Sequence, residues 1–426
     1  MSFSLAVLGV LFVLLLLRSA PLIVTIGLPC VAYILIEGLP ISLFAQRLFT
    51  GIDIFLLLAI PMFALAGEIM NSGTLTDRLV AFAQTLVGRL RGGLAGVNVL
   101  SSMFFSGITG SGAADVSATG SLLIPMMKRA GYSAEFSAAL TAISAIVGPI
   151  IPPSIVFIMY ASLSGTSVAS LFVAGIVPGL LMSCAHFATA IAISYRRGYA
   201  AGEPTSMKRI IETGIGAMPA LTVPFVIMAA ILFGITTATE ASALAVFLAL
   251  ALGLVVYRTL TLSKLFSGAF RVGSDMADTM LIIGVSNLLA WILAVERVPV
   301  MLAEAVLGLT TDPILVLLLI NLILLVAGMF LDTFPALIIL TSVLLPLAQS
   351  VGVDPIHFGV IISLNLMIGA VTPPVGILLF IATRIANADV VRTVKETLPF
   401  LAVSLVVQLI VTFVPALSSG VASLVR

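Results

Sequence analysis

Residues 148–154 have the sequence Gly148-Pro-Ile-Ile-Pro-Pro-Ser154, which interrupts a long apolar segment, residues 134–163. A second apolar segment, residues 355–386, contains Gly369-Ala-Val-Thr-Pro-Pro-Val-Gly376 near its middle. Proline lacks an amide hydrogen and clashes with the preceding helical turn, so two prolines after a glycine unwind a helix. Both segments are therefore predicted to be broken helices.

The composition of the surrounding chain predicts an all-α polytopic membrane protein. Of its 426 residues, 61% are hydrophobic and 9% are charged, whereas soluble domains carry about a quarter charged residues. The net charge of +1 gives no basis for binding nucleic acid. The two cysteines, Cys30 and Cys184, lie far apart and indicate neither a disulfide framework nor a metal cluster. No resident cofactor is expected, and membrane lipid is the expected surrounding.

About 20 apolar residues cross a bilayer as a helix. On this basis, ten segments are predicted to be full spans: 2–17, 20–37, 51–71, 134–163, 170–195, 217–234, 237–257, 277–295, 355–386 and 398–417. Six amphipathic segments are predicted to lie separately along the membrane surface: 40–49, 74–88, 204–216, 259–275, 298–309 and 388–397. The chain has no Gly-x-x-x-x-Gly-Lys-Ser/Thr loop for ATP, so an ion gradient is the simplest source of energy.

Two further apolar segments, residues 93–130 and 313–350, are interrupted midway and are predicted to be re-entrant helical hairpins. The interruptions are Ser106-Gly-Ile-Thr-Gly-Ser-Gly-Ala-Ala-Asp115 and Gly328-Met-Phe-Leu-Asp-Thr-Phe-Pro335. Each half is shorter than the roughly 20 residues that a full span needs. Each hairpin is therefore expected to enter and leave the membrane on the same side.

Charged residues beside the hairpins predict opposite orientations. Lys and Arg collect on the cytoplasmic side of membrane proteins. The first hairpin is flanked by Arg89, Arg91, Lys128 and Arg129, so it is expected to open to the cytoplasm. No Lys or Arg occurs between Arg297 and Arg384, so the second hairpin is expected to open to the outside.

An internal repeat supports the same arrangement. A shift of 221 residues places Pro152-Pro153 on Pro373-Pro374 and Gly148 on Gly369 without a gap. The predicted organisation is a first repeat, 1–200, a cytoplasmic connection, 201–216, and a second repeat, 217–426. Two copies of opposite orientation form an inverted repeat, which is the usual architecture of secondary transporters.

The breaks and the hairpin tips are the predicted binding regions. Carbonyl groups freed by a helix break must line a protein-enclosed cavity, where they suit a hard monovalent cation. The first tip offers the hydroxyl groups of Ser106, Thr109 and Ser111, and the second offers Asp332 and Thr333. The position of Asp115 is equally compatible with capping the following helix and with binding an ion. The helix N-termini at both tips favour an anion, so a coupled cation–anion symport is expected.

The segments 105–115 and 148–154 resemble the large membrane subunit of tripartite ATP-independent periplasmic (TRAP) transporters, and residues 369–376 match the corresponding second-half pattern. The resemblance covers essentially the whole chain. It implies an inverted-repeat, elevator-type carrier, like those of the ion transporter superfamily, that sodium drives in a bacterial inner membrane. It also implies two partners, a periplasmic substrate-binding protein and a small four-helix membrane subunit. The small subunit is expected as a separate chain, because this chain starts directly in a predicted span.

The resemblance further implies two sodium sites and an imported organic anion, such as a C4-dicarboxylate, a sialic acid or another carboxylate. The first sodium site would comprise Ser106, Thr109, Ser111, Gly148 and the carbonyl of Ile151. The second would comprise Asp332, Thr333, Gly369 and Thr372. The residues expected to contact the anion are Gly110, Gly112, Pro152, Pro153, Pro373 and Pro374.

The sequence also bears on two other classes of function. A stand-alone sodium/carboxylate symporter of the di/tricarboxylate type, working without a binding protein, is the alternative. An enzyme is not expected, because no nucleophile–base or metal-ligand cluster recurs at one depth. A channel is not expected either, because inverted hairpins suit alternating access better than a filter. Glu68 is predicted to face the cytoplasmic interface.

Overall fold

The structure is a computed structural model that describes residues 2–18, 20–72, 75–202 and 205–423. Residues 74 and 204, which begin two of the predicted surface segments, lie outside these ranges. Within them every named element is a helix, as the composition predicts. Eight of these described helices are long and apolar enough to cross a membrane. The chain is thus an all-α polytopic membrane protein.

The two predicted hairpins are present with the expected bounds. In the first, α6 (Gly93–Thr109) and α7 (Gly112–Arg129) are joined by Gly110 and Ser111. In the second, α15 (Pro313–Phe330) and α16 (Thr333–Ser350) are joined by Leu331 and Asp332. Gly110 adopts φ +58°, a left-handed conformation that glycine tolerates without a steric penalty. This glycine lets the chain reverse within two residues.

Both Pro-Pro segments break a helix, as predicted. The first broken helix consists of α8 (Ala134–Ser144), η2 (Ala145–Val147) and, after the break, α9 (Ile155–Ser164). The second consists of α17 (Pro355–Gly369) and α18 (Ile377–Ala386). The halves interlock, because α7 packs against α18 and α16 packs against α9. Each hairpin therefore touches the broken helices of both halves.

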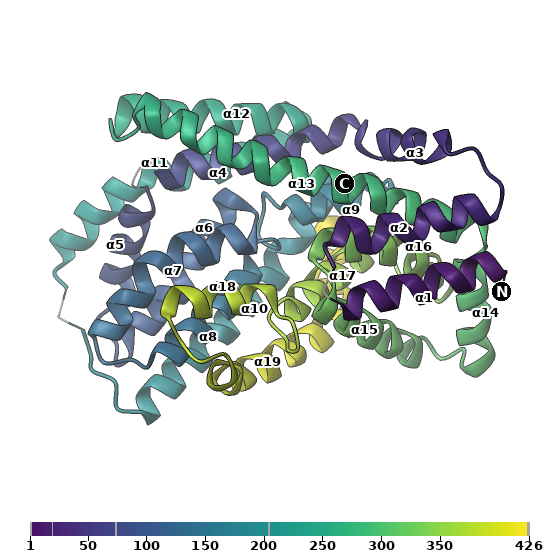
Figure 1. Cartoon of the computed structure of the whole chain (residues 1–426). Coiled ribbons are helices and arrows are strands. Elements are labelled where there is room, and N and C mark those ends of the chain that lie inside the picture. Colours follow the sequence, from purple (N-terminus) through teal and green to yellow (C-terminus); the bar gives the residue numbers. More distant parts are fainter. Residues whose placement is uncertain (1, 19, 73–74, 203–204, 424–426) are drawn as a thin grey trace.

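A layer of helices covers the hairpins along the upper edge of Figure 1. Here α4 packs against α12 and α13, and α13 packs against α3. The elements of this layer and of the N-terminal part are α1 (Phe3–Leu17), α2 (Leu22–Ile36), α3 (Ser42–Ile52), η1 (Phe55–Leu58), α4 (Ala59–Ser72), α5 (Leu75–Val87), α11 (Met207–Leu232), α12 (Ala238–Ala251), the π-helical η3 (Leu252–Val256) and α13 (Leu262–Val295). We call α4 and α13 the wall helices, because they face the hairpin tips.

Three of the predicted surface segments are not separate elements. Segments 204–216 and 259–275 continue directly into α11 and α13, and segment 388–397 continues into α19 (Val390–Phe413). The prediction was wrong because it used polarity to end a helix. Helical hydrogen bonding propagates through polar residues unless a residue that disfavours helix intervenes. Segments 40–49, 74–88 and 298–309 do correspond to separate helices, α3, α5 and α14 (Val298–Leu309).

Polar contacts between distant segments fix the two halves against each other. The Tyr160 hydroxyl group on α9 donates a hydrogen bond to the Pro355 carbonyl oxygen at 2.6 Å. His186 on α10 (Val168–Arg196) lies 2.8 Å from the Ser404 hydroxyl oxygen on α19. Near the other end of these helices, Arg197 forms an ion pair with Glu396 at 2.8 Å. The last elements of the described residues are two short helices, η4 (Pro415–Leu417) and α20 (Ser419–Ala422).

Candidate functional site

The tip of the first hairpin packs directly against the first helix break. A Cβ atom added to Gly110 would lie 2.7 Å from the carbonyl oxygen of Pro153, and one on Gly107 would lie 3.6 Å from that of Pro152. Contact as close as that at Gly110 leaves no space for a side chain. The glycines of the tip therefore bring backbone carbonyl groups of the break against the hairpin.

The candidate hydroxyl groups of the first tip lie at the end of α6 and at the start of α7. Ser106 donates a hydrogen bond to the Ser102 carbonyl oxygen at 2.6 Å. Thr109 donates one to the Phe105 carbonyl oxygen at 3.4 Å. Ser111 is the N-cap of α7, and its hydroxyl oxygen accepts from the Ala114 amide at 3.4 Å. All three oxygens retain lone pairs that could face a cation.

Asp115 is not the cap of α7, because Ser111 occupies that position. The Asp115 side chain is fully buried, and within the described residues its carboxylate oxygens make no hydrogen bond of normal geometry, although the Ser102 and Thr119 hydroxyl groups lie near them. Of the two roles that the sequence left open, capping is therefore excluded. A functional role for Asp115 stays a prediction.

The other residues predicted for the first site lie in the break itself. A Cβ atom on Gly148 would lie 3.7 Å from the amide nitrogen of Gly112, so Gly148 adjoins the tip. The Ile151 side chain packs on α10, where a Cβ atom on Gly179 would approach its Cγ1 atom to 2.6 Å. Ser154 caps α9 and donates a hydrogen bond to the Pro149 carbonyl group. The capping role of Ser154 was not predicted, although a serine before an apolar helical run is a common capping signal.

The second half of the site repeats this arrangement with different residues. A Cβ atom on Gly369 would lie 2.6 Å from the backbone of Gly328, so tip and break are again in contact. Asp332 is the N-cap of α16, but its side chain makes no capping hydrogen bond. Thr372 donates a hydrogen bond to the Ile368 carbonyl oxygen at 2.7 Å. Unlike the first break, this one is partly open, and Pro374 is exposed.

Both tips open onto one cavity of about 610 Å³. Six of the predicted residues line it: Thr109, Gly110, Ser111, Gly112, Asp332 and Thr333. Met367 lies between the tips, because its Sδ atom is 3.8 Å from the Thr333 hydroxyl oxygen and its Cε atom would be 3.0 Å from a Cβ atom on Gly112. The other predicted residues are not among those that line the cavity: Ser106, Gly148, Ile151, Pro152, Pro153, Gly369, Thr372, Pro373 and Pro374.

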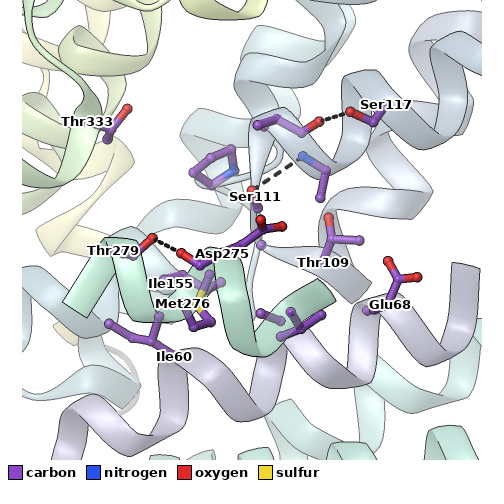
Figure 2. A pocket seen from close by; sticks show the side chains of 18 of the residues that line it. Ile60, Glu68, Thr109, Ser111, Ser117, Ile155, Asp275, Met276, Thr279 and Thr333 are labelled. Carbon is purple, nitrogen blue, oxygen red and sulfur yellow. Dashed lines mark hydrogen bonds between the residues drawn. The ribbon is translucent and has the colours of Figure 1, made fainter. Parts of the chain in front are cut away.

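The wall helices close the opposite side of the cavity, which the sequence did not reveal. Figure 2 shows Glu68 and Asp275 on these helices near Thr109 and Ser111 of the first tip, while the Thr279 hydroxyl group donates a hydrogen bond to the Asp275 carbonyl oxygen. Glu68 on α4 forms an ion pair with Arg271 on α13. Glu68 lines the cavity wall, and its predicted position toward the cytoplasmic interface stays a prediction. A charged residue in an otherwise apolar helix was the available signal, but its partner lies 203 positions away.

The arrangement is suited to holding ions of both signs. Helices α7 and α16 begin at the tips, so their first amide groups and their dipoles favour an anion. The carbonyl oxygens behind the tips and the Asp332 carboxylate favour a cation. Among the described residues, no group of three or more His, Cys, Asp or Glu side chains could hold a metal ion.

Comparison with known proteins identifies the family. Residues 8–417 match the family model described as tripartite ATP-independent periplasmic transporter, DctM component. The chain is 42% identical over 409 residues to the isethionate TRAP transporter permease protein DctMQ of Oleidesulfovibrio alaskensis. The aligned region includes 95% of this chain and 64% of that protein's length. It is 39% identical over 382 residues to the sialic acid TRAP transporter large permease protein SiaM of Vibrio cholerae, covering 90% of both.

A further relative is the C4-dicarboxylate TRAP transporter large permease protein DctM of Pseudomonas aeruginosa, 36% identical over 374 residues and 88% of both chains. The fold resembles the crystal structure of the Alcanivorax borkumensis YdaH transporter, with a TM-score of 0.62 and 15% identity over 87% of this chain and 86% of that one. The sequence relatives favour the TRAP prediction over the stand-alone symporter. The chain belongs to the tripartite ATP-independent periplasmic transporter family as its large permease component, a multi-pass protein of the inner membrane.

Proposed function

We propose that this permease imports an organic anion together with sodium ions. The observation that carries the proposal is the shared cavity, in which a neutral tip and an acidic tip face each other. A sodium ion behind each tip would offset the negative charge of Asp332 and of the incoming anion. Binding of the cation and binding of the anion would then favour each other, which is the thermodynamic basis of symport.

The proposed first sodium site combines Ser106, Thr109, Ser111, Gly148 and the Ile151 carbonyl group. The proposed second site combines Asp332, Thr333, Gly369 and Thr372. Close tip-to-break packing at Gly110 and Gly369 supports both sites. The hydroxyl, carbonyl and carboxylate oxygens of these residues are the ligand types that a hard cation prefers.

The proposed anion carries a carboxylate or sulfonate group. The relatives named for isethionate, sialic acid and C4-dicarboxylates support this class, because all three compounds are organic anions. The anion would lie at the glycine-rich ends of α7 and α16, near Gly110 and Gly112. The prolines of the two breaks, Pro152, Pro153, Pro373 and Pro374, would shape the backbone behind it.

The proposed mechanism is an elevator movement of the hairpins and broken helices past the wall helices. Two inverted repeats, 1–200 and 217–426, would give inward and outward states of similar free energy. The word tripartite in the family description supports two partners, a small four-helix membrane subunit and a periplasmic binding protein. The binding protein would deliver the anion.

Reconstitution tests the proposal directly. The permease would be placed in proteoliposomes with its small subunit, and radiolabelled succinate, N-acetylneuraminate and isethionate would be offered with the matching binding protein. We expect accumulation of at least one anion under an inward sodium gradient, loss of accumulation with a sodium ionophore, and no requirement for ATP. Equal uptake without a sodium gradient would overturn the coupling, and full uptake without any binding protein would favour the stand-alone symporter.

A further inference from the structure

The cavity wall contains an ion pair between Arg271 and Glu68, and the proposed symport assigns no role to this pair. Arg271 is the one basic side chain among the described residues that line the cavity. Three acidic side chains line it with Arg271: Glu68, Asp275 and Asp332. An organic anion entering this space meets a formal excess of negative charge, so the position and availability of the single guanidinium group matter.

The ion pair is placed so that it can open. The side chain of Arg271 is 61% exposed and that of Glu68 is 18% exposed. Solvent-exposed ion pairs contribute little to stability, because water and salt screen both charges. The hydroxyl group of Ser72 also donates a hydrogen bond to Glu68 at 3.1 Å, so Glu68 keeps a partner when Arg271 leaves. Exchange of the Glu68 carboxylate for the carboxylate of another molecule at Arg271 therefore costs little free energy.

The guanidinium group also has free capacity. It has five N–H donors in a planar fork that matches an oxyanion in a bidentate geometry. In the part of the chain that the structure describes, a single nitrogen of Arg271, Nη2, bonds to Glu68 through Oε1. Arg271 lines the same cavity as Thr109 and Ser111 of the first tip.

We infer that Arg271 is a specificity-determining contact for the transported anion, whose carboxylate or sulfonate group displaces Glu68 from the guanidinium group. This inference rests on the proposed import of an organic anion. Glu68 acts as an internal competitor that occupies Arg271 when the cavity is empty. Its presence keeps the affinity for the anion low enough for release, because a bound anion must give up its contact to an always-present carboxylate.

The position of Arg271 means that the anion would contact it from the cytoplasmic side of the membrane. The distribution of basic residues predicts that Arg258, Lys264 and Arg271 lie toward the cytoplasm. The wall helices would stay in place while the tips move, so the anion would reach Arg271 only when the cavity faces inward. The contact would therefore act on cytoplasmic release and on binding from the inside, with little effect on binding from the outside.

Two substitutions of opposite expected effect test the inference. Arg271→Gln removes the contact, and Glu68→Gln removes the competitor. Both would be prepared in the full complex in proteoliposomes, with whichever of succinate, N-acetylneuraminate or isethionate the wild-type complex accumulates. The half-saturating anion concentration would be measured for exchange from the inner face and for uptake from the outer face. Lys264→Gln is the matched control, because it removes a positive charge from the same helix outside the cavity.

We expect Arg271→Gln to raise the half-saturating anion concentration at the inner face roughly tenfold, because the variant loses one charge-assisted hydrogen bond to the anion. Glu68→Gln should lower it by several-fold, and Lys264→Gln should leave it unchanged. A pair that only holds α4 against α13 predicts the same direction of change for both variants on both faces, and that result would overturn the inference. Wild-type values for Arg271→Gln in an active complex would overturn it too. If the wild-type complex accumulates none of the three anions, the proposed function fails first, and the inference falls with it.

Discussion

The two half-sites share one backbone plan but differ in charge and in exposure. Ser111 and Asp332 hold the same place, each as the N-cap of the outgoing helix of its hairpin. At the first half-site the break is almost entirely buried, and its carbonyl groups pack on glycines of the tip. At the second half-site the break is partly exposed, and the tip carries a carboxylate instead of a hydroxyl group.

The difference indicates a division of roles between the half-sites. In the proposed function, the first would hold ions with uncharged dipoles, whose positions depend on tight packing. The second would hold them with a formal charge, which acts over a longer distance and tolerates a looser structure. Function at the first half-site should therefore be sensitive to shape, and function at the second should be sensitive to charge.

The sharpest test of this division is Asp332→Asn, which removes the charge and keeps the size of the side chain. We expect sodium-dependent uptake in proteoliposomes to fall more than about tenfold, because an acidic group inside a membrane is retained for function. Thermal stability in detergent should stay close to that of the wild type. Asp312→Asn on the same hairpin is the control, since asparagine caps a helix as well as aspartate does. Undiminished sodium dependence of Asp332→Asn would remove the carboxylate from the second half-site.

The shape of the first half-site is tested by Gly110→Ala. Alanine at φ +58° is strained, and its Cβ atom would lie 2.7 Å from the Pro153 carbonyl oxygen. We expect a loss of about 2 kcal/mol or more in the free energy of unfolding by SDS, together with weaker sodium binding. Gly131→Ala provides the comparison, because Gly131 has φ +86° with nothing within 4 Å of an added Cβ atom. Its cost should be about 1 kcal/mol; equal costs for both variants would mean that the tip and break do not pack as described.

A milder packing test applies to the second half-site. A Cβ atom on Gly369 would lie 2.6 Å from Gly328, whereas one on Gly328 would lie 3.2 Å from Gly369. We expect Gly369→Ala to destabilise the protein by about 1–3 kcal/mol in SDS unfolding and Gly328→Ala to cost less. If this half-site is the looser one, both variants should keep measurable sodium-dependent uptake. Complete inactivity of both, in stably folded protein, would contradict the proposed tolerance of the second half-site.

The smallest effect is expected where the two halves meet at the surface. Arg197, which follows α10, forms an ion pair with Glu396 on α19. Their side chains are 39% and 23% exposed. We expect Glu396→Gln to change the free energy of unfolding by less than about 1 kcal/mol, because solvent screens such pairs. Glu212→Gln, which removes the more exposed pair with Lys208, should change it still less. A larger loss for Glu396→Gln would show that the halves depend on this contact.

Much of the local structure could be predicted from residues that constrain the backbone by themselves. Gly110 and Ser111 mark the first hairpin tip, and the Pro-Pro pairs mark both breaks, because glycine and proline act through their own dihedral angles. The first residues of α11, α13 and α19 could not be predicted in this way. Their first turns are polar, and polarity reports the surroundings of a helix without reporting where its hydrogen bonds stop.

The sequence by itself determined the membrane class, the hairpins, the breaks and the residues that give the two tips their different chemistry. These features follow from composition and from backbone restrictions that act within a few residues. Only the tertiary structure decided that α4 and α13 close the cavity, that Arg271 meets Glu68 there, and that Asp115 lies buried away from the cap. These facts depend on packing between segments far apart in the chain, and no local pattern of residues encodes which surfaces meet.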